Sequence, residues 1–233
     1  MHAGRASGAL LLALLVAAAP AAAQEPGTAT FHITDRAGAV GTASATLARE
    51  GEGWRLTGIS DMPGLRLAVR QLEVHYDPLW RPRHLTMEMS SPDDDAIVHV
   101  AFGLAGGETR TDIVRASGAV YGANKVSPDT LPLPDFVFSA YEALAGRLAT
   151  ASPGTELHAF VVPRFEVPVA VERVEDESVA TRSGRLAARH WHLRFLRADG
   201  AAVVDLWSAD GRLIRIDFEK DGLRVVRDDV VIQ

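Results

Sequence analysis

Apolar and polar residues alternate with a period of two along most of the chain, which is the pattern of β-strands that bury one face. Gly, Pro and Asp residues, which favour turns, separate the alternating runs at short intervals. About a dozen such runs leave too little chain between them for crossover helices. We therefore predict a mainly β protein, a large curved antiparallel meander that forms a half-barrel or an open barrel. Clear examples of the runs lie at 28–34, 40–48, 83–91 and 96–102.

One segment breaks this alternation and predicts an amphipathic helix over residues 135–150. Its apolar side chains recur every three or four residues, at Val137, Tyr141, Leu144 and Leu148. Pro134 and Asp135 mark its start, and Ser139 with Glu142 has the spacing of a capping box. A curved open sheet has an apolar face that needs a partner, so we expect this helix to pack across the sheet.

Asp-Gly dipeptides recur every eleven residues in the C-terminal third, beginning at Asp199, Asp210 and Asp221. Between alternating runs such dipeptides favour type I′ hairpin turns, because both central residues of that turn need positive φ. A two-residue turn centred on each dipeptide sets the register of the flanking strands. The predicted cross-strand pairs include Arg194 with Asp205, Trp207 with Ile214, and Arg215 with Asp228.

A further hairpin is predicted over residues 171–188, with its turn at Ser183-Gly184. With a loop of two residues, Glu175 faces His192 and Glu177 faces His190 across the strands. With a loop of four residues, Glu175 faces His190 instead. In either register the two glutamates and the two histidines share one face of the hairpin.

That shared face is a candidate metal site, because neutral imidazoles with carboxylates make a donor set that suits zinc or iron. The candidate ligands are His190, His192, Glu175 and Glu177. The ordinary alternative is a solvated strand pair in which carboxylates lie opposite histidines for a modest electrostatic gain. Trp191 is on the other face of the same strand and is expected to pack inward. We expect no cofactor. The alternative function is that of a metal-binding protein or a metal-assisted enzyme that uses these four residues.

The first 23 residues have the pattern of a secretory signal peptide. An apolar run from Ala9 to Ala19 follows a basic start, and an A-x-A site predicts cleavage between Ala23 and Gln24. The run is too short to span a bilayer and no later apolar run is longer, so we expect no membrane span. We expect one β-rich domain over residues 24–233, in the periplasm or secreted.

Composition and missing motifs limit the function further. The chain has no cysteine, which excludes disulfides, thiol chemistry and a lipid anchor at the cleavage point. Its formal net charge is −6, so a nucleic-acid partner is not expected. The sequence contains no G-x-S-x-G elbow, H-E-x-x-H, P-loop or G-x-G-x-x-G motif, and this favours a non-enzymatic protein.

The order of four segments resembles a group of exported bacterial proteins classed as domains of unknown function. These segments read GAVGTASATLAREGEGWRLTG, LPDFVFSAYEALAGRL, VATRSGRLAARHWHL and VVDLWSADGRLIRIDF. That group is similar in style to the LolA-like open β-sheet proteins of the cell envelope. The resemblance implies a curved antiparallel sheet with a helix across its concave face, which in LolA-like proteins holds lipid acyl chains. It implies no catalytic residue.

Apolar side chains under the predicted helix make a candidate pocket for an apolar small molecule or lipid-like ligand. The candidate lining residues are Met87, Met89, Phe138, Tyr141 and Leu144, each of which also fits an ordinary core position. A non-enzymatic binding or carrier protein is therefore the favoured function. A second alternative is an envelope scaffold or interaction protein, which would contact another envelope protein through exposed strand edges.

Overall fold

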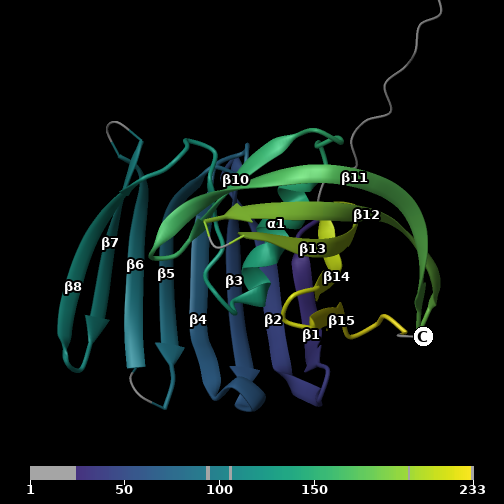
Figure 1. Cartoon of the computed structure of the whole chain (residues 1–233), viewed down its shortest axis with the longest axis horizontal. Coiled ribbons are helices and arrows are strands. Elements are labelled where there is room, and N and C mark those ends of the chain that lie inside the picture. Colours follow the sequence, from purple (N-terminus) through teal and green to yellow (C-terminus); the bar gives the residue numbers. More distant parts are fainter. Residues whose placement is uncertain (1–24, 93–94, 105–106, 199, 232–233) are drawn as a thin grey trace, which may run out of the picture.

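A computed structural model describes residues 25–92, 95–104, 107–198 and 200–231 (Figure 1). Residues 1–23, over which the signal peptide is predicted, lie outside this part. The described chain forms one large sheet of 15 strands with a single α-helix, which confirms the mainly β prediction. No helix among these residues has the length and apolar character needed to cross a membrane.

The first half of the sheet is a simple up-and-down meander, drawn upright in Figure 1. A 3-10 turn, η1, joins its third and fourth strands. The elements are β1 (Gly27–Asp35), β2 (Gly38–Glu50), β3 (Gly53–Met62), η1 (Pro63–Leu65), β4 (Leu67–Tyr76), β5 (Pro82–Ser90), β6 (Asp95–Leu104), β7 (Glu108–Arg115) and β8 (Gly118–Lys125).

The second half begins with the helical segment and continues as another meander, whose strands cross in front of the first half in Figure 1. Its elements are β9 (Leu131–Pro132), the 3-10 turn η2 (Phe138–Ala140), α1 (Tyr141–Leu148), β10 (Glu156–Val161), β11 (Phe165–Thr181), β12 (Gly184–Arg197), β13 (Gly200–Ala209), β14 (Arg212–Phe218) and β15 (Leu223–Arg227).

The two halves join because the first strand pairs with the last. Antiparallel pairing of β1 with β15 gives the continuous order β8 to β1, then β15 to β9. All neighbouring strands are antiparallel except β9 and β10, which are parallel. β8 and β9 are the two edges, so the sheet is an open barrel rather than a closed one. Hydrogen bonds from Ser127 to Glu166 tie the connection between these edges to β11.

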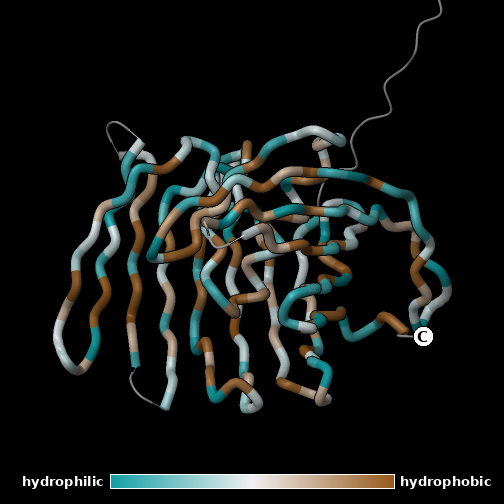
Figure 2. Tube along the Cα trace, viewed as in Figure 1, coloured by the Kyte–Doolittle hydropathy of each residue, from teal (hydrophilic) through white to brown (hydrophobic). Residues whose placement is uncertain are grey.

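Apolar side chains of both halves meet in one core between the crossing layers, with α1 inside it. Figure 2 shows the alternation of apolar and polar residues along the strands that builds this core. Trp191 is fully buried and its indole N–H donates to Ser208 Oγ at 2.9 Å, which confirms that the tryptophan face of β12 packs inward.

The helix is shorter than predicted and begins differently. η2 precedes α1, so regular α-helix covers only residues 141–148 of the predicted 135–150. The predicted stripe does face the core: Val137, Leu144 and Leu148 are buried and Tyr141 packs against the core. The prediction of a capping box is wrong, because the N-cap residue of α1 is Ala140, whose side chain makes no capping hydrogen bond.

Glu142 has a different role, as half of a buried ion pair between α1 and β14. Its side chain is 0% exposed, and both carboxylate oxygens accept from the Arg212 guanidinium, at 3.1 and 3.2 Å. The Leu213 backbone N–H donates to the same carboxylate at 3.1 Å. Arg212 also donates to the backbone carbonyls of Glu25 and Gly27. One pair therefore fixes the helix, β14 and the start of β1 together.

The helical segment lies very close to β3, and a glycine makes this approach possible. A side chain at Gly58 would place its Cβ only 2.4 Å from Ser139 Oγ and 2.6 Å from Ser139 Cβ. Both distances are shorter than any non-bonded contact between such atoms, so η2 can sit against β3 only where the strand has no side chain.

Of the three predicted Asp-Gly turns, the middle one forms as expected. Asp210 and Gly211 have φ angles of 49° and 72°, both in the left-handed region that a type I′ turn needs. A β-bulge opposite Trp207 and Ser208 then places one extra residue in β14. Trp207 consequently pairs with Arg215, and the predicted pair with Ile214 is wrong.

The first Asp-Gly hairpin turns one residue earlier than predicted, which moves every cross-strand partner by two residues. Arg197 pairs with Gly200, so Gly200 begins β13 instead of completing the turn. Arg194 therefore lies opposite Val203, and its predicted pairing with Asp205 is wrong. A shift of two residues keeps every side chain on its predicted face, because strand side chains alternate with a period of two.

The last hairpin also differs from the prediction, with a loop two residues longer. Arg215 pairs with Val226 rather than with Asp228. An opposite-charge pair still forms across these strands, between Asp217 and Arg224, with Arg224 Nε 3.2 Å from Asp217 Oδ1.

On the outer face of the first half, two carboxylates flank one histidine. His75 on β4 lies between two carboxylates, with Nδ1 2.5 Å from Glu50 and Nε2 2.7 Å from Glu73. Burial disfavours the imidazolium, but the hydrogen bonds and charges of the two glutamates outweigh it and raise the pKa of His75 above 6.5.

We predict that Glu142→Gln lowers the free energy of unfolding by about 3 kcal/mol, because it leaves the Arg212 guanidinium buried without its counter-charge. Urea denaturation followed by circular dichroism measures this loss. Glu52→Gln, at an exposed position of the β2–β3 turn, removes the same charge and is expected to leave the midpoint unchanged. Equal midpoints for both variants would contradict the assigned role of Glu142.

We also predict that His75 stabilises the fold in acid and not in base. Its raised pKa means that the stabilisation is complete below the unfolded value of 6.5 and is lost as pH rises through the folded pKa. The melting temperature of His75→Gln is therefore expected to lie further below the wild type at about pH 5.5 than at about pH 8.5. His32→Gln, at an exposed position of β1, serves as the control. A gap that widens with rising pH would refute the assignment.

Candidate functional site

A pocket of about 300 Å³ lies between the helical segment and the adjoining ends of β11, β12, β13 and β14. We call it the helix pocket. Its inner wall is formed by strand residues that are far from the helix in the sequence, among them Phe195, Val204 and Phe218. The pocket therefore forms within the second half, where the helical segment meets several strands, and no single hairpin could form it.

Aromatic side chains make the floor of the helix pocket. The ring of Phe218 lies 5.7 Å from that of Phe138 and 5.6 Å from that of Tyr141, the second in edge-to-face geometry. Burial raises the pKa of Tyr141 well above its usual value, against the opposing charge of Arg197. The phenol is thus neutral, so this part of the wall carries no charge at physiological pH.

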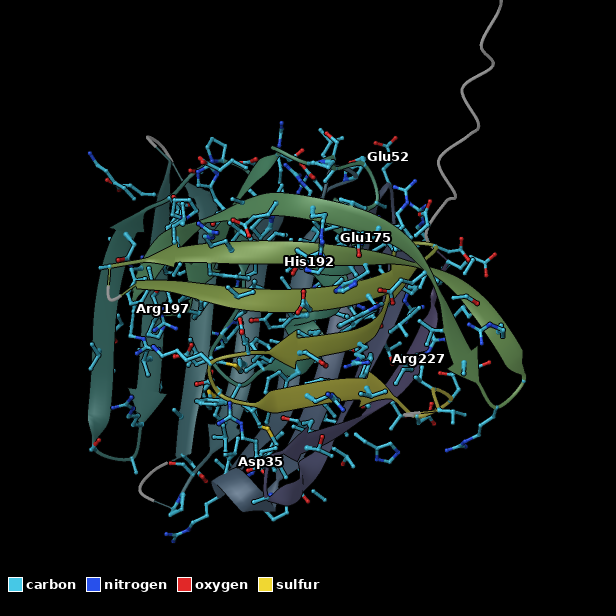
Figure 3. The ribbon with its side chains drawn as sticks, turned by 45° about the vertical axis from the view of Figure 1, so that its right-hand side comes forward. Asp35, Glu52, Glu175, His192, Arg197 and Arg227 are labelled. Atoms are coloured by element: carbon cyan, nitrogen blue, oxygen red, sulfur yellow. The ribbon has the colours of Figure 1, made fainter. Side chains whose placement is uncertain are left out.

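Charged side chains surround the apolar floor. The lining residues include three cationic side chains, of Arg164, Arg197 and Lys220, and two carboxylates, of Asp135 and Asp221. Arg164 forms an ion pair with Asp135, and about half of its side chain is exposed. Figure 3 shows Arg197 near the end of β12, away from His192 in the same strand. The pocket thus joins an apolar interior to groups that attract an anion.

The residues predicted to line a ligand pocket fall into two groups. Phe138 and Tyr141 line the helix pocket. Leu144 and Met87 are instead fully packed in the core, with 1% and 2% of their surface exposed, and Met89 is partly buried against that core. Alternation in the sequence identifies inward-facing residues, but it does not distinguish those beside a pocket from those in filled interior.

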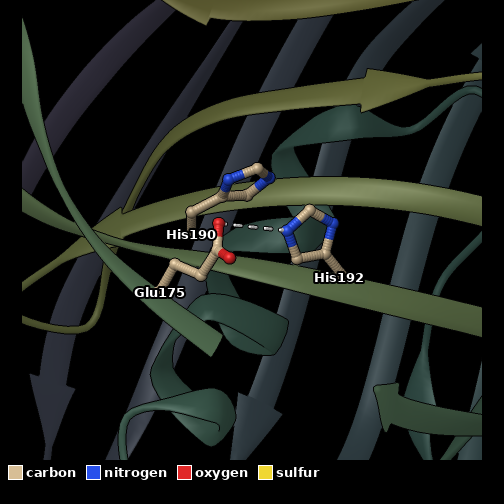
Figure 4. A group of neighbouring side chains, drawn as sticks. All are labelled: Glu175, His190 and His192. Carbon is tan, nitrogen blue, oxygen red and sulfur yellow. Dashed lines mark ion pairs between the residues drawn. The ribbon is translucent and has the colours of Figure 1, made fainter. Parts of the chain in front are cut away.

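The predicted histidine and glutamate residues do lie together, on the outer face of β11 and β12 (Figure 4). Glu175 pairs directly with His190, the second of the two predicted registers, although the loop has two residues. One ligand atom from each of Glu175, His190 and His192 lies within 4.8 Å of the others. We call these three residues the histidine cluster. The two imidazole centroids are 4.1 Å apart.

Glu177 stands beside this cluster and holds His190 in place. Its carboxylate lies 2.9 Å from His190 Nδ1 and accepts the indole N–H of Trp207 at 2.8 Å. Trp207 stacks on His190 with centroids 3.9 Å apart, and Arg215 covers the Trp207 ring. Burial opposes ionisation of Glu177, but the donors Trp207 and His190 outweigh it and lower its pKa.

Two residues that the sequence did not indicate complete the surroundings of the cluster. Asp205 Oδ1 lies 2.6 Å from His192 Nδ1 and 3.2 Å from His190 Nε2. The Arg173 guanidinium lies 2.7 Å from His192 Nε2 and 3.2 Å from a Glu175 oxygen. The erroneous register had placed Asp205 opposite Arg194, which instead pairs with Glu172. A bulge in β11 brings Arg173 opposite His192, and no local signal in the sequence predicts it.

Comparison with known proteins supports the fold and not a function. No family model matches the chain, and no curated protein matches it. Its structure is similar to that of a beta-barrel-like protein of domain of unknown function DUF1849 from Brucella abortus, with a TM-score of 0.57. The match has 9% sequence identity and covers 91% of this chain and 99% of that chain. The likeness at this identity shows a shared mainly β, barrel-like fold alone.

Proposed function

We propose that this protein is a non-enzymatic carrier or binding protein for a single-chain amphiphile, with an apolar chain and an acidic head group, held in the helix pocket. The observation that carries the proposal is the combination of an aromatic floor with a cationic edge in one concave site. Sites for small molecules are typically apolar clefts of about 300 to 1,000 Å³ with a few oriented polar groups. The helix pocket is at the lower end of that range, which favours one chain over two.

The apolar chain would lie against Phe138, Tyr141 and Phe218. Each methylene group that leaves water contributes about 0.8 kcal/mol, so a chain of moderate length suffices for tight binding. The head group would lie near Arg197 and Lys220. A charge-assisted hydrogen bond to either cation is shorter and stronger than a bond between neutral groups, and it orients the ligand.

The expected location agrees with such a ligand. Residues 1–23 have the pattern of a signal peptide, so we propose that binding takes place in the periplasm or after secretion. Fatty acids and lipid fragments in these compartments need a protein that shields their chains from water. The use of a concave sheet face for acyl chains, as in LolA-like proteins, is the corresponding proposal for this fold.

A second candidate function, contact with an envelope protein, has a separate observation in its favour. β8 is an open edge of the sheet, and Val120 and Tyr121 on it are 58% and 69% exposed. An exposed edge strand can accept a strand from another chain by backbone pairing. Such a partner would leave the helix pocket free.

The carrier proposal predicts that the protein binds palmitate below its micellar concentration, measured by calorimetry. Ala202→Phe is expected to abolish binding, because Ala202 lines the helix pocket and a larger side chain fills it. Ala201→Phe is the matched control, since the neighbouring side chain is exposed on the opposite face of β13. Wild-type affinity in the Ala202→Phe variant would overturn the proposal.

The acidic head group is tested by comparing palmitate with hexadecanol. Lys220→Gln is expected to weaken palmitate binding about tenfold, the loss of one charge-assisted hydrogen bond, and to leave hexadecanol binding unchanged. Equal effects on both ligands would refute the role of the cationic edge. Failure of both ligands to bind the folded wild type would refute the pocket itself and leave the edge strand as the functional surface.

A further inference from the structure

We propose that the histidine cluster, Glu175 with His190 and His192, binds a divalent transition-metal ion, with zinc the best match. The proposal is independent of the amphiphile, because the cluster is on the outer face of the sheet and the helix pocket is inside. Trp191, between the two histidines in sequence, is fully buried and marks the inner face of the same strand.

The three side chains have the donor types and spacing that zinc uses. Two imidazole nitrogens and one carboxylate oxygen form a common set of three protein ligands, with the fourth position left for water. The ligand atoms here lie within 4.8 Å of one another. Around zinc they would lie roughly 3.3 Å apart, given bonds of about 2.0 Å in tetrahedral geometry. Glu175 is 43% exposed and free to close that gap.

His190 is held in the orientation that a metal ligand requires. Glu177 accepts a hydrogen bond from His190 Nδ1–H, and stacking on Trp207 fixes the ring plane. Metal-bound histidines usually donate their other ring N–H to a carboxylate in this way, which sets the tautomer. With Nδ1 engaged by Glu177, Nε2 is the nitrogen left for a metal, and it lies 3.2 Å from Asp205 Oδ1. Glu177 acts here as a positioning residue rather than a ligand.

The second ring nitrogen of His190, Nε2, faces another carboxylate, that of Asp205. With its proton on Nδ1, Nε2 is an acceptor, yet it faces the Asp205 carboxylate at 3.2 Å. Two acceptors at this distance repel each other unless a proton or a cation lies between them. Three carboxylates, of Glu175, Glu177 and Asp205, surround the two imidazoles and would favour a dication over a single proton.

Arg173 supplies positive charge to the cluster in the structure described here. Its guanidinium contacts His192 Nε2 and Glu175, the groups that a metal would bind. About 60% of its side chain is exposed, so it can swing into solvent without disturbing the core. A metal would replace it, and the two cations should compete. This competition distinguishes the proposal from an ordinary surface ion-pair network.

Titration of the purified full chain with zinc chloride, followed by calorimetry, tests the proposal. We expect one zinc ion per chain, loss of binding in His192→Ala, and about tenfold weaker binding in Glu177→Gln, as for other carboxylates that orient a ligand. Arg173→Gln should bind zinc several-fold more tightly than the wild type. Because an unfolded variant cannot gain affinity for a preformed site, this result stands even if His192→Ala folds poorly.

The matched control is the double variant His84→Ala/His99→Ala. These two histidines also stack on the outer face of the sheet, with centroids 6.3 Å apart, and are expected not to contribute. Cobalt substitution should give the visible spectrum of a tetrahedral site, altered by Glu177→Gln. Absence of zinc binding in the folded wild type, unchanged affinity in His192→Ala, weaker binding in Arg173→Gln, or loss of binding in the control would each overturn the proposal.

Discussion

Antiparallel hydrogen bonds between β1 and β15 join two meanders that would otherwise be separate sheets. Phe31 on β1 lies opposite Arg227 on β15, and both strands bury residues of the common core on one side. Because the second half is continuous with the first through this ladder, its strands can curve back over the concave face and enclose α1. The Glu142–Arg212 pair then fixes the helix to the strand next to β15. The residues of both candidate sites belong to this second half, which the ladder joins to the first.

Side chains of β12 point alternately to the two faces of the sheet, so this one strand contributes residues to both candidate sites. His190 and His192 point outward to the histidine cluster, while Phe195 points inward to the helix pocket. In the two proposals, one strand positions groups for a cation on one face and for an apolar chain on the other. The two faces use different chemistry without competing for residues, and a change in one site need not alter the ligands of the other.

Much of the fold follows from the sequence, because alternation and turn residues are local signals. The curved meander, the inward face of Trp191 and the positive φ angles at Asp210-Gly211 were all predictable on this basis. The errors come from features that local patterns do not encode. Bulges in β11 and β14 each insert a residue. The faces were nevertheless predicted correctly, because the remaining register shifts were of two residues.

The candidate sites were predictable only in part, and for a related reason. Phe138 and Tyr141 were identified because they belong to one short helical segment with a clear stripe. Phe218 and Arg197 were missed, since they lie on different strands that meet the helical segment only in the folded second half. In the histidine cluster, His190 and Glu175 were placed by one hairpin. Asp205 and Arg173 were missed because their positions depend on a turn shift and a bulge.

The pairing of the first strand with the last also determines when the fold can be completed. Phe31 finds its partner only after Arg227 is available, so nearly the whole chain lies within the loop that this ladder closes. Closing so long a loop lowers the entropy of the chain before the new contacts form and offset that loss. Topologies dominated by such distant pairs therefore fold slowly. The sheet can therefore be completed only after β15 has been synthesised. Such a delay would suit the export that we propose from the signal-peptide pattern of residues 1–23.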